Sequence, residues 1–377
     1  PEAFVPFGDD TMYIAPEAGM LAKTAEKIRS QLPDAKWALL GGYSAESWSD
    51  LAIDRPDIEH RIVAHLSGRT DADIKTGDDV TGEIAEIRYR VMGHGPVLVL
   101  TPMAFAPSQW EPVLVALAEQ FRVVVLSGRR LGMLALLEQR AALSDWQDMC
   151  AGLFNALSLK ENNQVLEVGC GSGAIARQFV AETEGRNPLT AIDISPYLLG
   201  EARNFVLPGA CPITFALGSA ESLPFEADVF DAAYSVTVLE ECSARKALDE
   251  LKRVVRPGGR VGVIVRAIDL PQWWNMPLDP DIKAKIAVPA SSKGPDGVAD
   301  STLYELALEA GLRPLRMYTY SVASESAEGP VFEFPEMHAL ALLNDEEKAQ
   351  YHAAKTAAVA STTLFMTRGH HCFVGEV

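Results

Sequence analysis

The chain has 377 residues, 48% of them hydrophobic, and is therefore long enough to form two ordinary domains, each with its own core. Its formal net charge of −18 would repel a phosphate backbone, and no cluster of Lys and Arg interrupts this acidity, so nucleic acid is not an expected partner. No apolar run approaches the ~18 residues of a membrane span, and the five cysteines include no C-x-x-C pair, which argues against a disulfide framework or a structural zinc site.

The N-terminal region begins at Pro1 without a basic, apolar leader, so we expect a cytoplasmic protein that does not associate with membranes. Apolar residues recur at helical spacing from Met20 to Leu32. Two further short helical patterns follow from Ser44 to Leu66. Together these patterns predict a small helical cap.

The next segment, Ile87 to Leu131, predicts two strands, a helix and a parallel strand. This order faintly resembles the opening of an α/β-hydrolase. However, the chain contains no G-x-S-x-G elbow, and the loop "TPMAF" after the second strand lacks the expected His-Gly. We therefore interpret residues 1–132 as a non-catalytic α/β accessory domain.

The second predicted domain covers residues 133–377 and opens with a linker helix from Met133 to Arg140. Ser144 is the expected N-cap of the following helix. From Gln164 onward, short apolar strands alternate with segments of helical period, beginning with the strand "VLEV" and the loop "GCGSG". This alternation predicts an α/β fold with a doubly wound, mostly parallel sheet.

The loop after the first strand of this sheet contains Gly169, Gly171 and Gly173. In doubly wound folds ligands bind beyond the carboxyl ends of the strands, where glycines allow a sharp turn and a close approach of the backbone to a ligand. Asp193 closes the second strand, where a carboxylate can accept both hydrogens of a ribose diol. Since G-x-G-x-x-A is also the dinucleotide fingerprint, the loop by itself fits both a nicotinamide site and an S-adenosylmethionine site.

Three further features separate these two kinds of site. Glu167 precedes the first glycine by two residues and suits a cationic amino group better than a pyrophosphate, which it would repel. A polar loop, Ser219 to Glu221, then precedes a fourth strand that ends near Ser235. Finally, "LDELKRVVRPGGRVGVIVRA" predicts a helix, a Pro-Gly-Gly turn and a fifth strand. Together these motifs resemble class I S-adenosylmethionine-dependent methyltransferases, especially those of ubiquinone and menaquinone biosynthesis.

The resemblance implies a seven-stranded sheet whose last strand inserts antiparallel between its neighbours, with S-adenosyl-L-methionine as the cofactor. It also implies a set of cofactor-binding residues, in which Asp193 holds the ribose, Ile194 packs on the adenine and Ser219 replaces the family's usual aspartate, which should weaken binding. That set comprises Glu167, Gly169, Cys170, Gly171, Gly173, Asp193, Ile194, Ser219, Ala220, Glu221 and Ser235.

Methyl transfer from a sulfonium mainly requires orientation of the reactants and exclusion of water, and a general base is needed only for a protonated acceptor. Glu241, which follows the fourth strand, is the candidate base. Arg266, Trp273 and Trp274 follow the fifth strand and are the candidates for contact with a small-molecule acceptor. No metal site is expected, because His338, His370 and His371 lack ligand spacing.

Two alternatives remain open on the sequence alone. One is an NAD-dependent oxidoreductase, and the other is a non-catalytic S-adenosylmethionine-binding protein with a regulatory role. The departures at Ser219 and Glu241, where the family has aspartate and histidine, keep the second alternative open. The sequence also allows a homodimer.

Overall fold

The computed structural model describes residues 12–18, 36–44, 55, 57–66, 80–100, 110–206, 213–290 and 293–377. The chain divides into two compact units, Pro1–Ala135 and Leu136–Val377. Among the residues that the structure describes, none of the helices combines the length and the apolar character that a membrane span requires.

The first unit contains a parallel pair of strands, β1 (Met12–Ala18) and β2 (Lys36–Ser44), and the helix α3 (Ile58–Leu66). The helix α3 lies within the segment from Ser44 to Leu66 where helices were predicted for a small helical cap, but the strands β1 and β2 were not predicted. The helix expected from Met20 to Leu32 lies outside the described residues. Strands β1 and β2 are stabilised by pairing with each other across the intervening chain, a contact that no local periodicity reveals.

The first unit also contains a four-stranded sheet in the order β3-β4-β6-β5. Its strands β5 and β6 are parallel, while β4 pairs antiparallel with β3 and with β6. The apolar side of the helix α4 packs with β6 in one core cluster. The elements are β3 (Val80–Ile84), β4 (Ile87–Met92), β5 (Val97–Leu100), α4 (Glu111–Ala118) and β6 (Arg122–Ser127).

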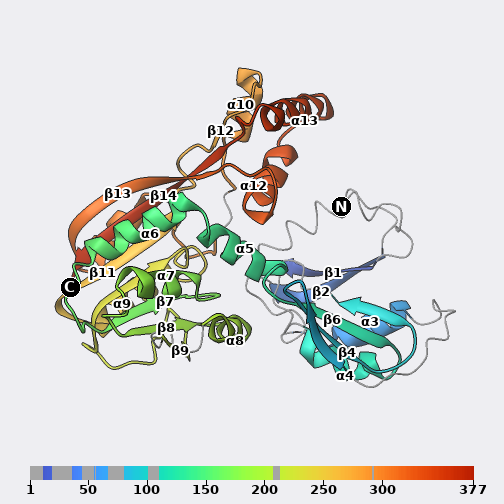
Figure 1. The fold of residues 1–377 in the computed structure, drawn as a ribbon, viewed down its shortest axis with the longest axis horizontal. Helices are drawn as coiled ribbons and strands as arrows, with labels where there is room; N and C mark the ends of the chain where they lie inside the picture. Colours follow the sequence, from blue (N-terminus) through green and yellow to red (C-terminus); the bar gives the residue numbers. More distant parts are fainter. Residues whose placement is uncertain are drawn as a thin grey trace. The chain divides into compact units, whose positions relative to one another are not determined.

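The second unit is built on one sheet, with the order β13-β14-β11-β10-β7-β8-β9 (Figure 1). Strands β11, β10, β7, β8 and β9 pair in parallel, whereas β14 is antiparallel to both β11 and β13. The strands are β7 (Val165–Val168), β8 (Leu189–Asp193), β9 (Ile213–Leu217), β10 (Phe230–Val236), β11 (Val255–Arg266), β13 (Arg313–Ser324) and β14 (Met366–Glu376).

An eighth strand adds to the predicted seven. The two-residue strand β12 (Trp273–Trp274) pairs antiparallel with the start of β14, at Met366 and Thr367. This strand lies beyond the end of β11, whose last residue, Arg266, pairs with His370. The prediction of seven strands therefore omitted a short segment, which forms a strand only because β14 offers it backbone partners.

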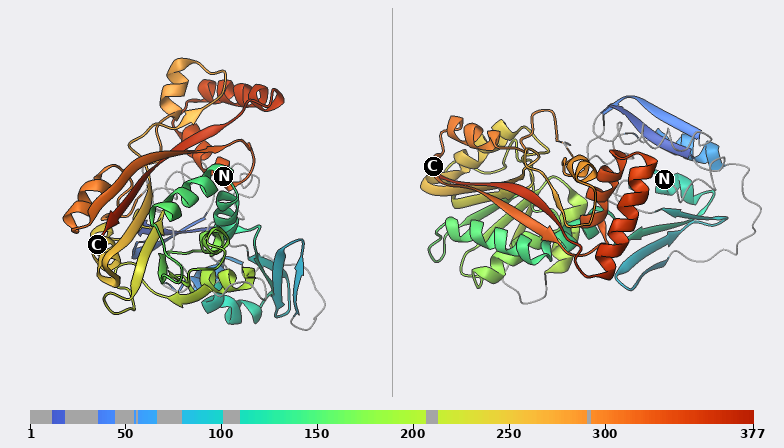
Figure 2. Two further views of the ribbon diagram at one scale, coloured as in Figure 1. Left: turned by 60° about the vertical axis from the view of Figure 1, so that its left-hand side comes forward. Right: turned by 90° about the horizontal axis from the view of Figure 1, so that it is seen from above.

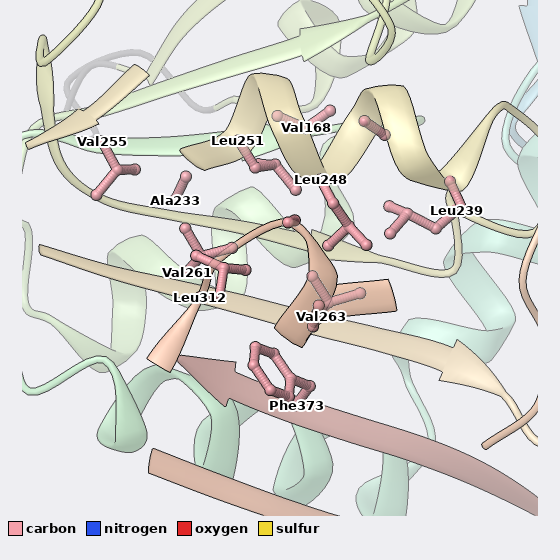
Figure 3. Packing of buried hydrophobic residues seen from close by; sticks show 14 of the residues in the cluster. Val168, Ala233, Leu239, Leu248, Leu251, Val255, Val261, Val263, Leu312 and Phe373 are labelled. Carbon is pink, nitrogen blue, oxygen red and sulfur yellow. The ribbon is translucent and has the colours of Figure 1, made fainter. Parts of the chain in front are cut away.

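Helices cover both faces of this sheet. One face is covered by α6 (Ser144–Ala156), α7 (Ala174–Glu182) and α8 (Pro196–Phe205), and the other by α9 (Ala244–Val254) and α11 (Thr302–Glu309). The helix α6 contacts β13, β14 and β11 (Figure 2). Leu248 and Leu251 of α9 belong to one packed cluster with Val261, Val263 and Phe373 of the sheet (Figure 3). Burial of such continuous apolar strands on both faces is typical of a doubly wound fold.

The start of α6 differs slightly from the prediction. Ser144 is the first helical residue, and the N-cap is Leu143, with no side-chain cap. The preceding helix, α5, spans Gly132–Ala141.

A separate helical segment is built from two stretches of the chain, one between β12 and α11 and the other between β13 and β14. Its helices are α10 (Pro280–Ile286), α12 (Pro330–Ala341) and α13 (Asp345–Ala360). They share an apolar cluster with Trp274 of β12 and Met366 of β14, so this segment is attached at the end of the sheet where β14 begins (Figure 1).

Candidate functional site

The predicted glycine loop joins β7 to α7 at the carboxyl end of the parallel strands. Gly169 has a φ of +79°, and a Cβ at this position would lie only 2.2 Å from Cγ2 of Val238. Gly173 has a φ of +72° and forms the N-cap of α7. Side chains are therefore disfavoured at Gly169 and Gly173 both by the left-handed backbone and by the close packing.

Asp193 holds the glycine loop against the end of β8. Its Oδ2 accepts a hydrogen bond of 2.7 Å from the Gly171 N–H, and its Oδ1 accepts one of 2.9 Å from the Ser195 N–H. The side chain is nearly buried, and burial raises the pKa of its carboxyl despite these backbone donors. Each oxygen retains a second lone pair, so the same carboxylate can still accept from a ribose diol.

Glu167 lies in β7 directly before the loop and is 1% exposed. Its Oε2 accepts a hydrogen bond of 3.1 Å from the Tyr234 hydroxyl in the neighbouring strand. Burial raises the pKa of Glu167 to about 8, with a further contribution from Asp193, while Tyr234 and Arg177 oppose the shift. A cation that approached this carboxyl would favour its ionised form.

The electrostatics of the loop discriminate between a cationic and an anionic ligand. The N–H groups of Gly169 and Cys170 donate to Ile192, that of Gly171 donates to Asp193, and that of Gly173 donates to the Cys170 carbonyl. These four donors are therefore already used, whereas a pyrophosphate site requires donors that point at the ligand. With the carboxylates of Glu167 and Asp193 beside it, the loop suits the sulfonium and ammonium of S-adenosylmethionine.

The predicted adenine side contains one exposed apolar residue and a polar loop. Ile194, directly after Asp193, is 57% exposed, as expected of a platform for a ring. The Ser219 hydroxyl accepts from the Glu221 N–H at 3.2 Å. The Glu221 carboxylate accepts from the Ser243 N–H at 2.8 Å and lies 3.2 Å from Lys246 Nζ, so it caps the start of α9. Ala220 packs against the core cluster under α9.

Two other predicted cofactor residues have buried side chains. The Ser235 hydroxyl is fully buried and donates to the Val168 carbonyl at 2.9 Å, which ties β10 to β7. Cys170 is 6% exposed, and burial raises the pKa of its thiol above its ordinary value. Because both side chains are buried, these two residues would contact the cofactor through their backbone atoms or through the small exposed part of the side chain.

The predicted acceptor residues separate into two places. The Arg266 Nη2 lies 3.0 Å from Oε1 of Glu241, and the Arg266 N–H donates to Glu240 at 2.7 Å. Trp274 is buried in the helical segment, where its indole N–H donates to the Ile286 carbonyl at 2.9 Å, whereas Trp273 is 64% exposed. The structure thus brings Glu241 and Arg266 together and places Trp274 in a core.

Three residues that lie near this site were not predicted from the sequence. Thr237, directly after β10, has a φ of +54°, which is rare for a β-branched residue and typical of functional loops. The next residue, Val238, packs on Gly169. From α5, Leu137 lies where a Cβ on Gly171 would come within 2.9 Å of its Cδ1. No local sequence pattern predicts the left-handed backbone of Thr237 or the contact between Leu137 and Gly171.

Comparison with known proteins locates a match in this same region. A family model described as a methyltransferase domain matches residues 166–263. Malonyl-[acyl-carrier protein] O-methyltransferase from Salmonella typhimurium is 36% identical over 125 residues, which are 33% of this chain and 46% of that protein. The O-methyltransferase resE from Aspergillus sclerotiorum is 31% identical over 195 residues, which are 49% of this chain and 67% of that protein. The chain thus spans less than half of the Salmonella protein and about two thirds of the Aspergillus protein.

Among solved structures, a SAM-dependent methyltransferase from Aquifex aeolicus is similar, with a TM-score of 0.37 and 16% identity. The similarity covers 63% of this chain and 95% of that one.

Proposed function

Because this chain belongs to the family of S-adenosylmethionine-dependent methyltransferases, we propose that it transfers the methyl group of S-adenosylmethionine to a nucleophilic atom of a small-molecule acceptor. The products are the methylated acceptor and S-adenosylhomocysteine. The observation that carries this proposal is the buried Glu167 beside a glycine loop in which the N–H groups of Gly169, Cys170, Gly171 and Gly173 already have acceptors, because this arrangement favours a cationic ligand.

Bound S-adenosylmethionine supplies an activated methyl carbon: a lone pair of the acceptor forms the new bond, the methyl–sulfur bond breaks, and its electron pair stays on sulfur. The residues of the chain bind and orient the reactants. Asp193 would accept from the ribose hydroxyls, Glu167 would face the cationic end of the methionine, and Ile194 would support the adenine. Alignment of the reactants supplies most of the rate enhancement expected for such a reaction.

Glu241 is the proposed proton acceptor when the nucleophilic atom carries a proton. Its carboxylate pairs with Arg266 at 3.0 Å, which fixes the position of the carboxylate beyond the end of β10. An acceptor that is already ionised, such as a carboxylate, would not need this step. Glu241, the proposed base, and Arg266, the proposed contact with the acceptor, therefore lie side by side.

Calorimetric titration with S-adenosylhomocysteine and, separately, with NADH tests the cofactor. We expect binding of S-adenosylhomocysteine and none of NADH. The alternative of an NAD-dependent oxidoreductase predicts the reverse, and that result would overturn the proposal.

A second experiment separates an enzyme from a non-catalytic binder. The protein is incubated with S-adenosylmethionine and a pool of small metabolites, and products heavier by one methyl group are sought by mass spectrometry. We expect such a product together with S-adenosylhomocysteine. Binding without any methylated product from a broad pool would favour the regulatory alternative.

A cytoplasmic location and a homodimer remain predictions from the sequence.

A further inference from the structure

A cluster of cationic side chains lies where α5, α6, β11 and β14 meet. The Arg140 guanidinium lies over the Trp146 ring, with its Cζ 4.2 Å from the ring centroid. The Trp146 ring in turn makes an edge contact with His370, with 5.3 Å between the centroids. These contacts join the end of α5 and the start of α6 to the middle of the sheet.

Strand geometry adds two more arginines to this cluster. Arg266 of β11 is the register partner of His370 in β14, so their side chains share one face of the sheet. Arg368 lies two residues before His370 on the same strand and therefore points to that face as well. Arg140, Arg266 and Arg368 thus converge beside Trp146 and His370, and we call these three the arginine cluster.

The arginine cluster has more positive than negative charge. Glu240 and Glu241 both contact Arg266, at 3.5 Å and 3.0 Å. Arg140 and Arg368 form no side-chain hydrogen bond or ion pair within the part of the chain that the structure describes. Burial lowers the pKa of Arg368 to about 10, and the charges of Arg140 and Arg266 lower it further. The charge of Glu240 partly compensates Arg140, whereas only the like charges of Arg140 and Arg266 act on Arg368. A half-buried cation such as Arg368 is costly unless a ligand supplies the missing anion.

Buried polar atoms at the same place also lack partners. Nδ1 of His370, Nε of Arg140 and Nε1 of Trp146 are all buried without a hydrogen-bond partner among the described residues. His370 and Trp146 are only 4% and 1% exposed. Native structures rarely leave several such atoms together unless a ligand or water satisfies them.

The arginine cluster adjoins the glycine loop. Leu137, one helical turn before Arg140 in α5, packs over Gly171. Glu138 of the same helix pairs with Arg177 of α7 at 2.7 Å. On the other side, the segment after β10 contacts the loop through Val238 and contacts Arg266 through Glu240 and Glu241. A group held by the arginines is therefore adjacent to the proposed methyl donor site.

We infer that Arg140, Arg266 and Arg368 form the anion-binding part of the acceptor site, so that the acceptor is a small molecule with a carboxylate or phosphate group. This inference rests on the proposed function for its location beside the donor. Both kinds of anion present two oxygens to a guanidinium fork, which explains why arginines rather than lysines gather here. The Trp146 Nε1–H, and Nδ1 of His370 in the tautomer that carries the proton there, would be further donors to the same group.

The test uses the full chain saturated with S-adenosylhomocysteine and titrated by calorimetry with malonate, with inorganic phosphate and with the neutral malonamide. We expect malonate or phosphate to bind and malonamide not to bind. Binding of malonate alone identifies a carboxylate acceptor, and binding of phosphate alone identifies a phosphate acceptor. Binding of neither anion would overturn the inference.

Three variants show where the anion binds. Arg368→Met should weaken anion binding by roughly tenfold or more, because it removes a guanidinium that can donate two charge-assisted hydrogen bonds. Arg368→Lys should restore part of the anion affinity. Arg186→Met is the matched control, since Arg186 is exposed and lies after α7. Equal anion affinity in Arg368→Met and the wild type would overturn the inference.

Two further readouts keep this inference distinct from the proposed function. Arg368→Met should retain its affinity for S-adenosylhomocysteine, which reports on the donor site alone. Its thermal midpoint should be equal to or above that of the wild type, because the variant removes an uncompensated charge. Failure of the wild type to bind S-adenosylhomocysteine would count against the proposed function, while anion binding can still be measured without it.

Discussion

Asp193 Oδ2 accepts a hydrogen bond of 2.7 Å from the backbone N–H of Gly171, which lies 22 residues earlier in the chain. This bond joins the ends of β7 and β8 at the carboxyl edge of the sheet. It means that the residue proposed to bind the ribose also shapes the loop proposed to bind the methionine. Loss of this carboxylate should therefore affect both stability and cofactor affinity.

The variant Asp193→Asn tests this coupling. The asparagine amide has a single acceptor oxygen, and its nitrogen only donates. Either the Gly171 or the Ser195 N–H therefore loses its acceptor, at a cost of about 1–3 kcal/mol in the free energy of unfolding. We expect the affinity for S-adenosylhomocysteine to fall by on the order of tenfold or more. Urea unfolding and calorimetry measure the two effects.

Asp231→Asn is the matched control. Asp231 also accepts a backbone N–H, from Gln164 at 2.7 Å, but it lies at the start of β10, at the opposite edge of the sheet. It should lose stability without losing cofactor affinity. An equal loss of affinity in both variants would show that the effect of Asp193 is merely structural.

Glu167 makes cofactor binding depend on pH. Its pKa of about 8 in the folded protein exceeds the ordinary 4.5, so the free protein holds a proton there at pH 7. Positively charged S-adenosylmethionine should favour the ionised carboxylate and release this proton. Its affinity should therefore rise as the pH rises toward 8 and level off above that value. Calorimetry in two buffers of different ionisation enthalpy measures the proton release.

The same shift affects the stability of the free protein. Because the folded pKa is raised, the contribution of Glu167 to stability is fully present below pH 4.5 and is lost as the pH rises through about 8. The variant Glu167→Gln keeps an acceptor for the Tyr234 hydroxyl but should remove both pH effects. S-adenosylhomocysteine, which keeps the ammonium but lacks the sulfonium charge, is the ligand control that shows which of the two cations drives the proton release. Proton release that persists in Glu167→Gln would assign it to another group.

Gly169→Ala tests the packing of the glycine loop. A left-handed alanine costs roughly 1–2 kcal/mol, and the contact of its Cβ with Val238 adds roughly 1–3 kcal/mol. Gly258→Ala is the matched control, because Gly258 has a φ of +80° and no atom within 4 Å of its added Cβ. The difference between the two variants in urea unfolding isolates the steric contact.

A double variant provides the second check on this contact. Val238→Ala should recover the steric part of the Gly169→Ala loss but not the part due to the left-handed backbone. If Gly169→Ala and Gly258→Ala lose the same stability, the Val238 contact does not restrict this position.

Glu221→Ala separates the two roles available to Glu221. Its carboxylate accepts from the Ser243 N–H at 2.8 Å, so its loss should lower the free energy of unfolding by about 1 kcal/mol, as for other lost helix caps. We expect the affinity for S-adenosylhomocysteine to change by less than roughly threefold, because the side chain serves α9. Lys246→Ala removes the ion pair alone and should cost less. A large loss of affinity in Glu221→Ala would assign its side chain to the cofactor.

The doubly wound fold was predictable because its signals are local. Each strand from β7 to β11 is a short apolar run bounded by a turn, and Gly169, Gly171 and Gly173 each supply a left-handed backbone in the loop after β7. The position of Asp193 at a strand end was equally visible. In the first unit, β1 and β2 escaped prediction because they form through mutual pairing.

The sequence by itself therefore determined the order of the elements from β7 to β11 and the position of the glycine loop, since these depend on residues close together in the chain. Only the tertiary structure decided which acids and which cations lie together at the proposed acceptor site. It buries Glu240, pairs Glu241 with Arg266, and places Trp274 in a core. It also brings Arg140 and Arg368 to one face. These arrangements arise from strand register and helix packing between segments that are 25 residues apart for Glu241 and Arg266 and more than a hundred residues apart for Arg140 and Arg368, and no local pattern encodes them.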